Sequence, residues 1–340
     1  MCGIAGIVES SGKPVSTQSI ETMCRALRHR GPDDEGVVDV GSKSTSDRKA
    51  SAVLGNRRLS VIDVDGGHQP ISNEDGTVWT VLNGEIYNYR ELRKSLEEAG
   101  HYFTTSSDTE VIVHAYEMYA DKFVEYLDGM FAIAIWDTRR QQLLLARDRF
   151  GKKPLLYAQR DSWCAFASEL QALLVLPEIQ REIDPAAVGS YLSYMAVPAP
   201  QTIYRSIRKL PPAHVPIFKD GRASLRRYWQ LSFVPKQDLS DVEAAERSVE
   251  LLRDAVRKRL VSDVPIGAFL SGGVDSSAVV ALMAELSDQP VKTFSIGFDE
   301  EAYNELPYAR RVAEEFGCDH HEFVVQPKAI EVLPRLVQHF

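Results

Sequence analysis

The sequence predicts two domains of different class, an α+β domain followed by an α/β domain with a parallel sheet. Short apolar segments of strand length fill the first 220 residues, and few helical segments interrupt them. From residue 242 on, helical and strand patterns alternate, which is typical of parallel strands joined by crossover helices. The 340 residues suffice for two separate cores.

The elements of the first domain follow from its apolar pattern. Strands are expected at residues 4–8, 53–54, 78–82, 131–136, 143–146 and 163–167. Helices are expected at residues 17–27, 89–99 and 109–119, and Gly100 ends the second of them. So few helices among many strands favour a layered α+β domain.

The first domain is expected to span residues 2–220, residues 221–241 a hairpin return and linker, and residues 242–340 the second domain. Five prolines keep residues 197–216 extended or looped. A hairpin turns at residues 219–221, with Tyr228 and Trp229 on its return strand. The second domain is predicted to contain helices and strands in alternation, at residues 242–260, 265–270, 276–286, 291–297, 303–316 and 321–325, with a last helix from about residue 327.

Composition excludes several classes of function. The net charge of −9 argues against a nucleic-acid-binding surface. There is no basic segment followed by a long apolar one at the start, and the apolar runs are far below the ~20 residues of a membrane span, so a cytoplasmic protein without a membrane partner is expected. The four cysteines show no disulfide or zinc spacing, and His320 and His321, adjacent on a strand, would face opposite ways. No dedicated metal site is expected.

Cys2 is the most informative residue of the first domain. Removal of Met1 would place a thiol and a free α-amine on one residue, and such an amine, with a pKa of roughly 7.7–8.0, can accept the thiol proton. That arrangement activates N-terminal nucleophiles. A cysteine at this position is more commonly the start of a buried strand, so the pattern needs support from other residues.

A glycine-rich string between a strand and a helix marks the second domain. It consists of Ser271, Gly272, Gly273, Val274, Asp275, Ser276 and Ser277. Glycines allow close backbone approach, and a helix N-terminus offers free amides to an anion. A capped turn that binds nothing is the alternative, but the position at the carboxyl end of a strand favours a nucleotide. The string lacks the Gly-Lys-Ser/Thr of a Walker loop and resembles the pyrophosphate loop of the ATP-pyrophosphatase superfamily.

Together with Cys2, this loop and a series of ordered strings resemble the glutamine-hydrolysing asparagine synthetase family over nearly the whole chain. The strings are MCGI at 1–4, HRGPD at 29–33, RLSVID at 58–63, NGEIYN at 83–88, SDTE at 107–110, RDRFGKKP at 147–154, ASEL at 167–170 and SIG at 295–297. The resemblance implies a four-layer αββα N-terminal-nucleophile glutaminase domain, then an incomplete ATP-dependent synthetase domain. It assigns HRGPD to organising a loop near the glutaminase site.

The resemblance also implies the roles of individual residues in the first domain. Cys2 would attack the side-chain amide of glutamine, with the Asn83 side chain and the Gly84 N–H as oxyanion donors. Arg58 would hold the α-carboxylate of glutamine and Asp108 its α-ammonium. The backbone around Val61, Ile62 and Glu85 would line the same pocket.

In the second domain the resemblance implies adenylation of a carboxylate, normally that of aspartate, and displacement of AMP by ammonia. Leu270 and Ile296 would contact ATP through their backbones, the residues from Ser271 to Ser277 would hold pyrophosphate, and Asp275 would help to position substrate-bound Mg²⁺. Glutamine, ATP and aspartate are therefore the expected small-molecule partners, and a homodimer is the expected assembly.

The chain departs from the family pattern where it stops at Phe340, three βα units into the synthetase domain. We expect a fragment of a longer protein. Three functions stay open: an asparagine synthetase, a relative that amidates another acid, and a stand-alone glutaminase or ATP-binding subunit. The second is suggested by KLPPAH at 209–214 and GAFL at 267–270, which resemble the exopolysaccharide- and exosortase-associated subgroup.

Overall fold

The computed structural model describes residues 1–41, 50–326 and 329–339. The chain divides into two compact units, Met1–Val234 and Pro235–Phe340. The sequence places the end of the first domain at residue 220, but the return strand of the predicted hairpin pairs within a sheet of the first unit. The division between the units follows Val234, which is 14 residues beyond the predicted end of the first domain and inside residues 221–241, the predicted hairpin return and linker.

The first unit contains two six-stranded antiparallel sheets. The first sheet has the strand order β10-β8-β9-β1-β3-β2. Its strands are β1 (Gly3–Glu9), β2 (Asp34–Asp39), β3 (Ser51–Arg58), β8 (Leu156–Arg160), β9 (Trp163–Ala167) and β10 (Arg208–Lys209). The central strand β1 is buried on both faces, because Ile4 and Val8 pack between the two sheets while Ala5 and Ile7 pack with the helix on the other side.

The second sheet has the order β12-β11-β7-β6-β5-β4. Its strands are β4 (Ile71–Ser72), β5 (Val78–Ile86), β6 (Gly129–Asp137), β7 (Gln142–Arg147), β11 (His214–Lys219) and β12 (Arg222–Arg227). Trp136 and Val81 from this sheet join Ile4 of the first sheet in a shared core. Burial of these apolar faces holds the two sheets together.

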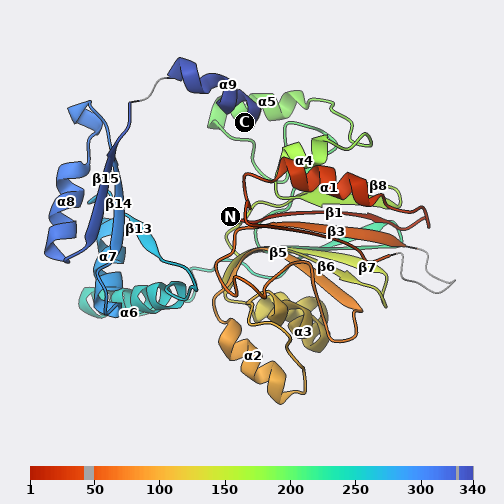
Figure 1. The fold of residues 1–340 in the computed structure, drawn as a ribbon, viewed down its shortest axis with the longest axis horizontal. Helices are drawn as coiled ribbons and strands as arrows, with labels where there is room; N and C mark the ends of the chain where they lie inside the picture. The colour runs from red at the N-terminus through yellow and green to blue at the C-terminus, as the bar shows by residue number, and fades with distance from the viewer. Residues whose placement is uncertain (42–49, 327–328, 340) are drawn as a thin grey trace. The chain divides into compact units, whose positions relative to one another are not determined.

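Helices cover the outer faces of both sheets (Figure 1). The helices beside the first sheet are α1 (Thr17–Ala26) and α4 (Leu170–Leu174), and those beside the second are α2 (Tyr89–Glu98), α3 (Glu110–Tyr119) and the 3-10 helix η1 (Ala120–Glu125). Ile20, Met23 and Cys24 pack α1 onto β1 and β3. This arrangement confirms the four-layer αββα prediction. A further helix, α5 (Pro185–Tyr194), begins at an Asp184 cap that accepts the Ala186 N–H.

For the hairpin at residues 214–227, the predicted turn is correct and the predicted return strand is wrong. Asp220 and Gly221 have φ values of 49° and 72°, as a tight two-residue turn requires. The return strand β12 ends at Arg227, so Tyr228 and Trp229 lie beyond it, contrary to the prediction. The Tyr228 hydroxyl instead donates a hydrogen bond to the Arg147 carbonyl at 2.9 Å.

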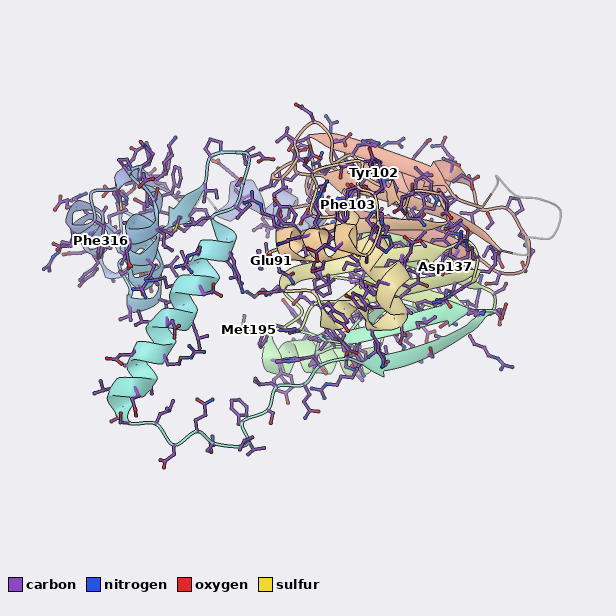
Figure 2. The ribbon with its side chains drawn as sticks, turned by 90° about the horizontal axis from the view of Figure 1, so that it is seen from below. Glu91, Tyr102, Phe103, Asp137, Met195 and Phe316 are labelled. Atoms are coloured by element: carbon purple, nitrogen blue, oxygen red, sulfur yellow. The ribbon has the colours of Figure 1, made fainter. Side chains whose placement is uncertain are left out.

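The second unit confirms the α/β prediction. Three parallel strands lie in the order β13-β14-β15, namely β13 (Gly267–Phe269), β14 (Lys292–Gly297) and β15 (Asp319–Val324). The helical elements are α6 (Asp241–Arg259), α7 (Val274–Leu286), the 3-10 helix η2 (Glu301–Tyr303), α8 (Leu306–Glu315) and α9 (Ala329–His339). Ser240 and Glu243 form a reciprocal capping box that fixes the start of α6, the long cyan helix of Figure 2.

Two element boundaries in the second unit differ from prediction. Helix α7 begins at Val274 and not at Ser276, because Gly273 already serves as its N-cap. Helix α8 begins at Leu306 and not at Tyr303, with Pro307 in its first turn. Within the described residues, no helix combines the length and apolar character that crossing a lipid bilayer requires.

Candidate functional site

One small pocket of the first unit brings together most of the residues predicted for glutamine hydrolysis. Residue Cys2 immediately precedes β1, Gly84 and Glu85 lie on β5, and Asp108 lies just before α3. The predicted residues that line this pocket are Cys2, Arg58, Val61, Ile62, Gly84, Glu85 and Asp108. Leu59, Gln69, Ser107 and Thr109 complete the lining and were not predicted. Asn83 is a neighbour of this set and not part of the lining.

The sulfur of Cys2 lies against the backbone of Leu59. The Leu59 N–H donates to Sγ at 3.4 Å, and the thiol donates to the Leu59 carbonyl at 3.7 Å. Burial raises the pKa of the Cys2 thiol, and the hydrogen bond from Leu59 only partly opposes this. The thiol is therefore protonated at neutral pH and needs a base before it can act as a nucleophile.

Arg30 fixes the backbone of Cys2. Its Nε donates to the Cys2 carbonyl at 2.8 Å, and its Nη1 pairs with Glu169 Oε1 at 2.6 Å. The His29 Nε2 lies 2.9 Å from the other oxygen of Glu169, and Asp33 accepts the N–H of Ser60 at 2.9 Å. The HRGPD string thus holds the chain around Cys2. Arg30 and Glu169 were not singled out as site residues, although both lie in quoted strings.

The Asn83–Gly84 pair lies where β5 packs closely against β6. A Cβ added to Gly84 would lie 2.1 Å from the Met130 carbonyl oxygen on β6, so no side chain fits there. Asn83 is fully buried, and within the described part of the chain neither its amide nitrogen nor its amide oxygen has a hydrogen-bond partner. A buried amide left unpaired normally costs stability, so Asn83 is an unusual residue beside the pocket.

Glu85 and Asp108 form a buried acidic pair in the pocket. Asp108 Oδ2 accepts the Ile86 N–H at 2.8 Å. Burial and the neighbouring Asp108 carboxyl raise the pKa of Glu85 to about 8, and burial raises the pKa of Asp108 to about 6. The pair therefore retains a proton near neutral pH, because the positive charges of Lys153 and Arg58 only partly offset burial and the repulsion between the two carboxylates. A ligand ammonium would add positive charge beside the pair and favour loss of this proton.

Arg58 closes the loop on one side of the pocket. Its Nη2 donates to the carbonyls of Ile62 and Asp63 at 2.8 and 2.7 Å, and its Nη1 donates to the Val64 carbonyl at 3.0 Å. The sequence predicts that this guanidinium holds an α-carboxylate. The loop carbonyls accept three of the five N–H groups of the guanidinium, and a bound carboxylate would accept the others. Arg58 therefore both shapes the loop and offers positive charge to the pocket.

Lys153 is a buried cation that the sequence analysis missed. Burial lowers the pKa of its ammonium, and the charges of Glu85 and Cys2 act in the opposite direction. Its backbone N–H donates to Asp148 Oδ2 at 3.0 Å, in a turn that Asp148 also caps through Phe150 and Lys152. The signal was present in the RDRFGKKP string, but the string alone does not show which of its two lysines turns inward.

A second pocket, of about 320 Å³, lies at the carboxyl ends of β13 and β14 in the second unit. Four of the residues predicted for ATP line it, namely Leu270, Ser271, Ser276 and Ile296. Phe269, Phe294, Ser295 and Glu305 complete the lining. Ligands of open α/β sheets bind at this edge.

The glycine-rich loop beside this pocket has a defined shape. The Ser271 and Ser276 hydroxyls lie 3.0 Å apart, and the Gly273 N–H donates to Ser271 Oγ at 3.2 Å. Gly272 has a φ of 79°, and a Cβ there would lie 2.4 Å from the backbone of Tyr308. Gly272, Gly273, Val274, Asp275 and Ser277 form the loop and the first turn of α7 but are not part of the pocket lining.

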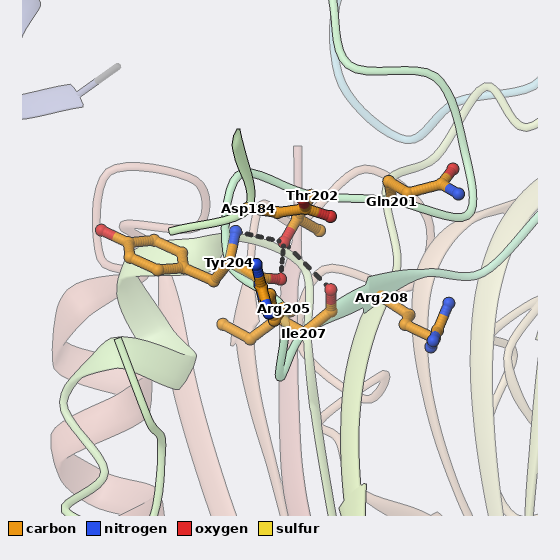
Figure 3. A pocket seen from close by; sticks show the side chains of 7 residues that line it. All are labelled: Asp184, Gln201, Thr202, Tyr204, Arg205, Ile207 and Arg208. Carbon is orange, nitrogen blue, oxygen red and sulfur yellow. Dashed lines mark hydrogen bonds between the residues drawn. The ribbon is translucent and has the colours of Figure 1, made fainter. Parts of the chain in front are cut away.

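A third pocket of about 330 Å³ holds no catalytic group (Figure 3). It is lined by Asp184, Gln201, Thr202, Tyr204, Arg205, Ile207 and Arg208. Thr202 Oγ1 contacts the carbonyls of Tyr204 and Ile207 at 2.9 and 3.0 Å and stabilises this turn. No thiol lines this pocket, and the Thr202 hydroxyl is engaged with two backbone carbonyls, so the Cys2 pocket is the stronger candidate for catalysis.

Two family models cover most of the chain. The glutamine amidotransferase domain model matches residues 1–229, and the asparagine synthase model matches residues 248–340. The chain belongs to the glutamine-hydrolysing asparagine synthetase family. The two matched segments correspond to the two structural units, with the Cys2 pocket in the first and the glycine-rich loop in the second.

Curated members of this family support the assignment. The glutamine-hydrolyzing asparagine synthetase 1 of Bacillus subtilis (strain 168) is 37% identical, over 100% of this chain and 53% of that protein. A putative asparagine synthetase 2 of Methanocaldococcus jannaschii is also 37% identical, over 98% of this chain and 66% of that protein. The chain thus spans about half to two thirds of the length of these relatives.

The fold is also similar to that of a solved structure. The allosteric regulatory enzyme of purine biosynthesis aligns with a TM-score of 0.51 at 17% identity, over 96% of this chain and 81% of that one. At this identity the likeness concerns the fold alone.

Proposed function

We propose that this chain carries the glutaminase site and part of the ATP site of a glutamine-dependent asparagine synthetase, acting in the cytoplasm. The observation that supports this best is the convergence in one pocket of Cys2, the backbone of Gly84 and the acidic pair Glu85 and Asp108. A thiol, an oxyanion donor and an ammonium-binding pair are the three groups that hydrolysis of glutamine requires.

The proposed first step activates the thiol. After removal of Met1, the α-amine of Cys2 takes the thiol proton. Burial lowers the pKa of the present terminal amine on Met1, and the same burial would keep an amine on Cys2 in its basic form. The pocket therefore needs no separate histidine as base.

The proposed chemistry then follows an acyl-transfer course. The thiolate attacks the side-chain carbonyl carbon of glutamine, and the Gly84 N–H and the Asn83 amide stabilise the oxyanion. Collapse of this adduct expels ammonia, which leaves with the proton that the amine held, and a thioester remains on Cys2. Water attacks the thioester, releases glutamate and regenerates the thiol.

Recognition of glutamine would use opposite charges at the two ends of its amino-acid group. Arg58 supplies positive charge for the α-carboxylate, and Asp108 with Glu85 supplies negative charge for the α-ammonium. The backbone of Val61 and Ile62 would line the side of the ligand. Desolvation of these groups makes each interaction stronger than it would be in water.

In the second unit, ATP would bind with its adenine against the backbone of Leu270 and Ile296 and its phosphates near the glycine-rich loop. The free amides at the start of α7 and the Ser271 and Ser276 hydroxyls suit phosphate oxygens. Mg²⁺ arrives with the nucleotide as part of the substrate, and Asp275, in the first turn of α7, offers a carboxylate toward it. Adenylated aspartate would then react with ammonia to give asparagine and AMP.

The division of labour between the units predicts the effect of Cys2→Ala in the protein that carries this chain. Glutamine-dependent release of AMP in the presence of aspartate should be lost, because no ammonia is formed. Release of AMP with added ammonia should be retained. Loss of both activities in Cys2→Ala would contradict the proposal. If the parent protein releases AMP only with an acid other than aspartate, the amidated substrate differs from the one proposed, and the glutaminase assignment still holds.

A further inference from the structure

A second cluster of titratable side chains lies in the first unit among residues that the Cys2 pocket does not use. Glu74 follows β4, His101 follows α2, and His114 and Glu117 lie one turn apart on α3. One ligand atom from each of these residues lies within 4.8 Å of the corresponding atoms of the other three. We propose that these four side chains form a structural site for a divalent transition-metal ion, with zinc as the best-matched metal. The proposal is independent of the function assigned to Cys2.

Four nitrogen–oxygen distances in the cluster are close to those between the ligands of a tetrahedral site, and the four ligand atoms all lie within 4.8 Å of one another. His101 Nδ1 lies 3.5 Å from Glu74 Oε1 and 3.7 Å from Glu117 Oε2. His114 Nδ1 lies 3.6 Å from Glu74 Oε2 and 3.6 Å from Glu117 Oε2. Tetrahedral ligand atoms about 2.1 Å from zinc are separated by about 3.4 Å. Side-chain rotations that bring these atoms closer, by up to about an ångström, would close the site around an ion.

His114 provides the observation that points to a ligand. Its side chain is fully buried, and within the described residues neither ring nitrogen has a hydrogen-bond partner. The edge of Phe103 packs against its ring, with centroids 4.4 Å apart, so the imidazole is held in place. The Nδ1 of this buried imidazole points between two carboxylates and makes a hydrogen bond to neither. Such unpaired buried polar groups cost free energy of folding, and a cation bound between them would remove that cost.

The other nitrogen of His114 faces a buried carboxylate, although the two groups are not within hydrogen-bond distance. Its Nε2 lies 3.7 Å from Oε1 of Glu110, a carboxylate that is itself buried. Glu110 is fixed by the N–H groups of Thr104 and Thr105, each at 2.7 Å. A carboxylate behind the imidazole favours a proton on Nε2 and leaves the Nδ1 lone pair for a metal.

The two glutamates are also held in place. Glu74 Oε1 accepts the Tyr102 N–H at 2.9 Å, and Glu117 Oε1 accepts Asn73 Nδ2 at 2.8 Å. Tyr102 and Phe103, labelled in Figure 2, mark the segment next to His101 that carries these contacts. The carboxylates and imidazoles are therefore preorganised by groups that do not themselves bind the ion.

The kinds of ligand atom select the metal. Two imidazole nitrogens and two carboxylate oxygens suit zinc, whereas magnesium and calcium prefer oxygen ligands alone. Three carboxylates, Glu74, Glu110 and Glu117, surround the two histidines, so a dication also neutralises a local excess of negative charge. The four ligands fill a tetrahedral shell, which is typical of a structural site and not of a catalytic one.

An ion at this place would tie α3 to the turn after β4 and to the segment after α2. Residue Asp108 of the Cys2 pocket lies two residues before the first residue of α3. Metal binding should therefore raise thermal stability, and its loss should loosen the end of the helix that leads into that pocket.

The test uses the whole chain freed of metal by a chelator and titrated with zinc against a competing chromophoric chelator. We expect one tightly bound zinc per chain and a rise in Tm on its addition. His101→Asn and Glu117→Gln change side chains that are partly exposed, so both variants should fold, and each should bind zinc at least tenfold more weakly. His321→Asn, which removes a histidine facing Asp319 in the second unit, should bind zinc as the wild type does.

Cobalt(II) provides a geometric readout that does not depend on enzymatic activity. The wild-type chain should give the intense visible absorption of four-coordinate cobalt, and the His101→Asn variant should give it weakly or not at all. Equal zinc affinity in the wild type, His101→Asn and Glu117→Gln would overturn the proposal. A Tm that changes with pH but not with zinc would also overturn the proposal, because the four side chains would then form an ion-pair cluster and not a metal site.

Discussion

Cys2 lies in surroundings that keep its thiol protonated, although a nucleophilic role needs the thiolate. Burial raises the thiol pKa, and the hydrogen bond from Leu59 recovers only part of that effect. The backbone carbonyl of the same residue is fixed by Arg30. An α-amine on Cys2 would lie next to the sulfur with its direction set by these contacts, so trimming of Met1 is the step that would make this residue reactive.

The acidic pair predicts a pH dependence of glutamine binding. An ammonium ligand needs the deprotonated pair, and the pKa values of Glu85 and Asp108 are raised to about 8 and about 6. Lowering the pH through this range adds protons to the pair and removes the charge that holds the ligand. The dissociation constant of glutamine on Cys2→Ala, measured by calorimetry, should therefore rise as the pH falls from about 8 to about 6.

Two variants check the origin of this effect. Asp108→Asn should bind glutamine weakly at every pH, with a flattened profile. Glu97→Gln removes an exposed carboxylate that pairs with Arg93, and its profile should match that of the parent. A parent profile that is flat across the range would show that the pair does not bind the ammonium.

Asn83 is predicted to contribute to the kcat of glutamine hydrolysis and to contribute little to the thermal stability of the protein. Its amide makes no hydrogen bond within the described residues, so Asn83→Ala removes no native bond. Loss of one oxyanion donor typically lowers kcat by ~10²–10³. Steady-state glutaminase assays and thermal melts of the same variant should therefore show a large fall in kcat with a small change in Tm.

Asn73 offers the matched comparison for this prediction. It is also buried, but its amide donates to Asp75, Thr77 and Glu117 and accepts two backbone N–H groups. Asn73→Ala should lower Tm and leave kcat near that of the parent. If Asn83→Ala instead behaves as Asn73→Ala does, the oxyanion role is wrong.

At the scale of elements, β5 organises the first site. Its register against β6 places Gly84 opposite Phe131, where the backbone carbonyl of Met130 excludes a side chain. The same strand continues into Glu85 and Ile86, whose N–H binds Asp108 at the start of α3. One strand thus positions both the proposed oxyanion donor and the acidic pair, so a change of its register would displace both together.

The loop before α7 predicts a contrast between two neighbouring glycines. Gly272→Ala forces a φ of 79° on alanine and brings its Cβ against the Tyr308 backbone, at a cost of about 1–3 kcal/mol. Gly273→Ala meets only Ser271 Oγ, at 3.3 Å. Gly272→Ala should lower the stability of the second unit and weaken ATP binding, measured by thermal melts and calorimetry in the protein that carries this chain.

Glutaminase activity should be unchanged in Gly272→Ala, since the loop lies in the other unit. Gly273→Ala should have much the smaller effect on stability. Equal effects of the two substitutions on stability and on ATP binding would contradict the loop geometry.

The sequence predicts those elements whose apolar pattern is strong, such as β5, β6 and α2. It misses β2 and β8, because the first is mostly acidic and glycine residues and the second carries polar residues on its exposed end. It also places Tyr228 and Trp229 on a strand that ends at Arg227, since aromatic residues favour strands wherever they occur. Local propensity therefore identifies strands with a continuous apolar sequence better than strands that carry several polar or glycine residues.

The residues of the candidate site likewise fall into those that sequence motifs identify and those that only the structure identifies. Motif strings place Cys2, Arg58, Glu85 and Asp108 in one pocket, and the structure brings them together. Lys153 is identified as a site residue only in the structure, where the turn capped by Asp148 directs this one of two adjacent lysines inward. The Glu74, His101, His114 and Glu117 cluster has no recognisable ligand spacing, because its members come from three segments that only the fold brings together.

At the scale of the whole molecule, chemistry is divided between two units with separate cores and separate pockets. The first unit contains a complete αββα sandwich, whereas the second contains three parallel strands of the synthetase type. The chain spans about half to two thirds of the length of its curated relatives.

The central claim is that Cys2, with its own α-amine as base, is the nucleophile of the glutaminase. The most direct measurement combines intact-mass analysis with glutaminase activity on one purified sample, before and after reaction with an electrophilic glutamine analogue. The account predicts that active protein lacks Met1, that the analogue adds once per chain at Cys2, and that activity is lost in proportion. Full activity in protein that retains Met1 would contradict it.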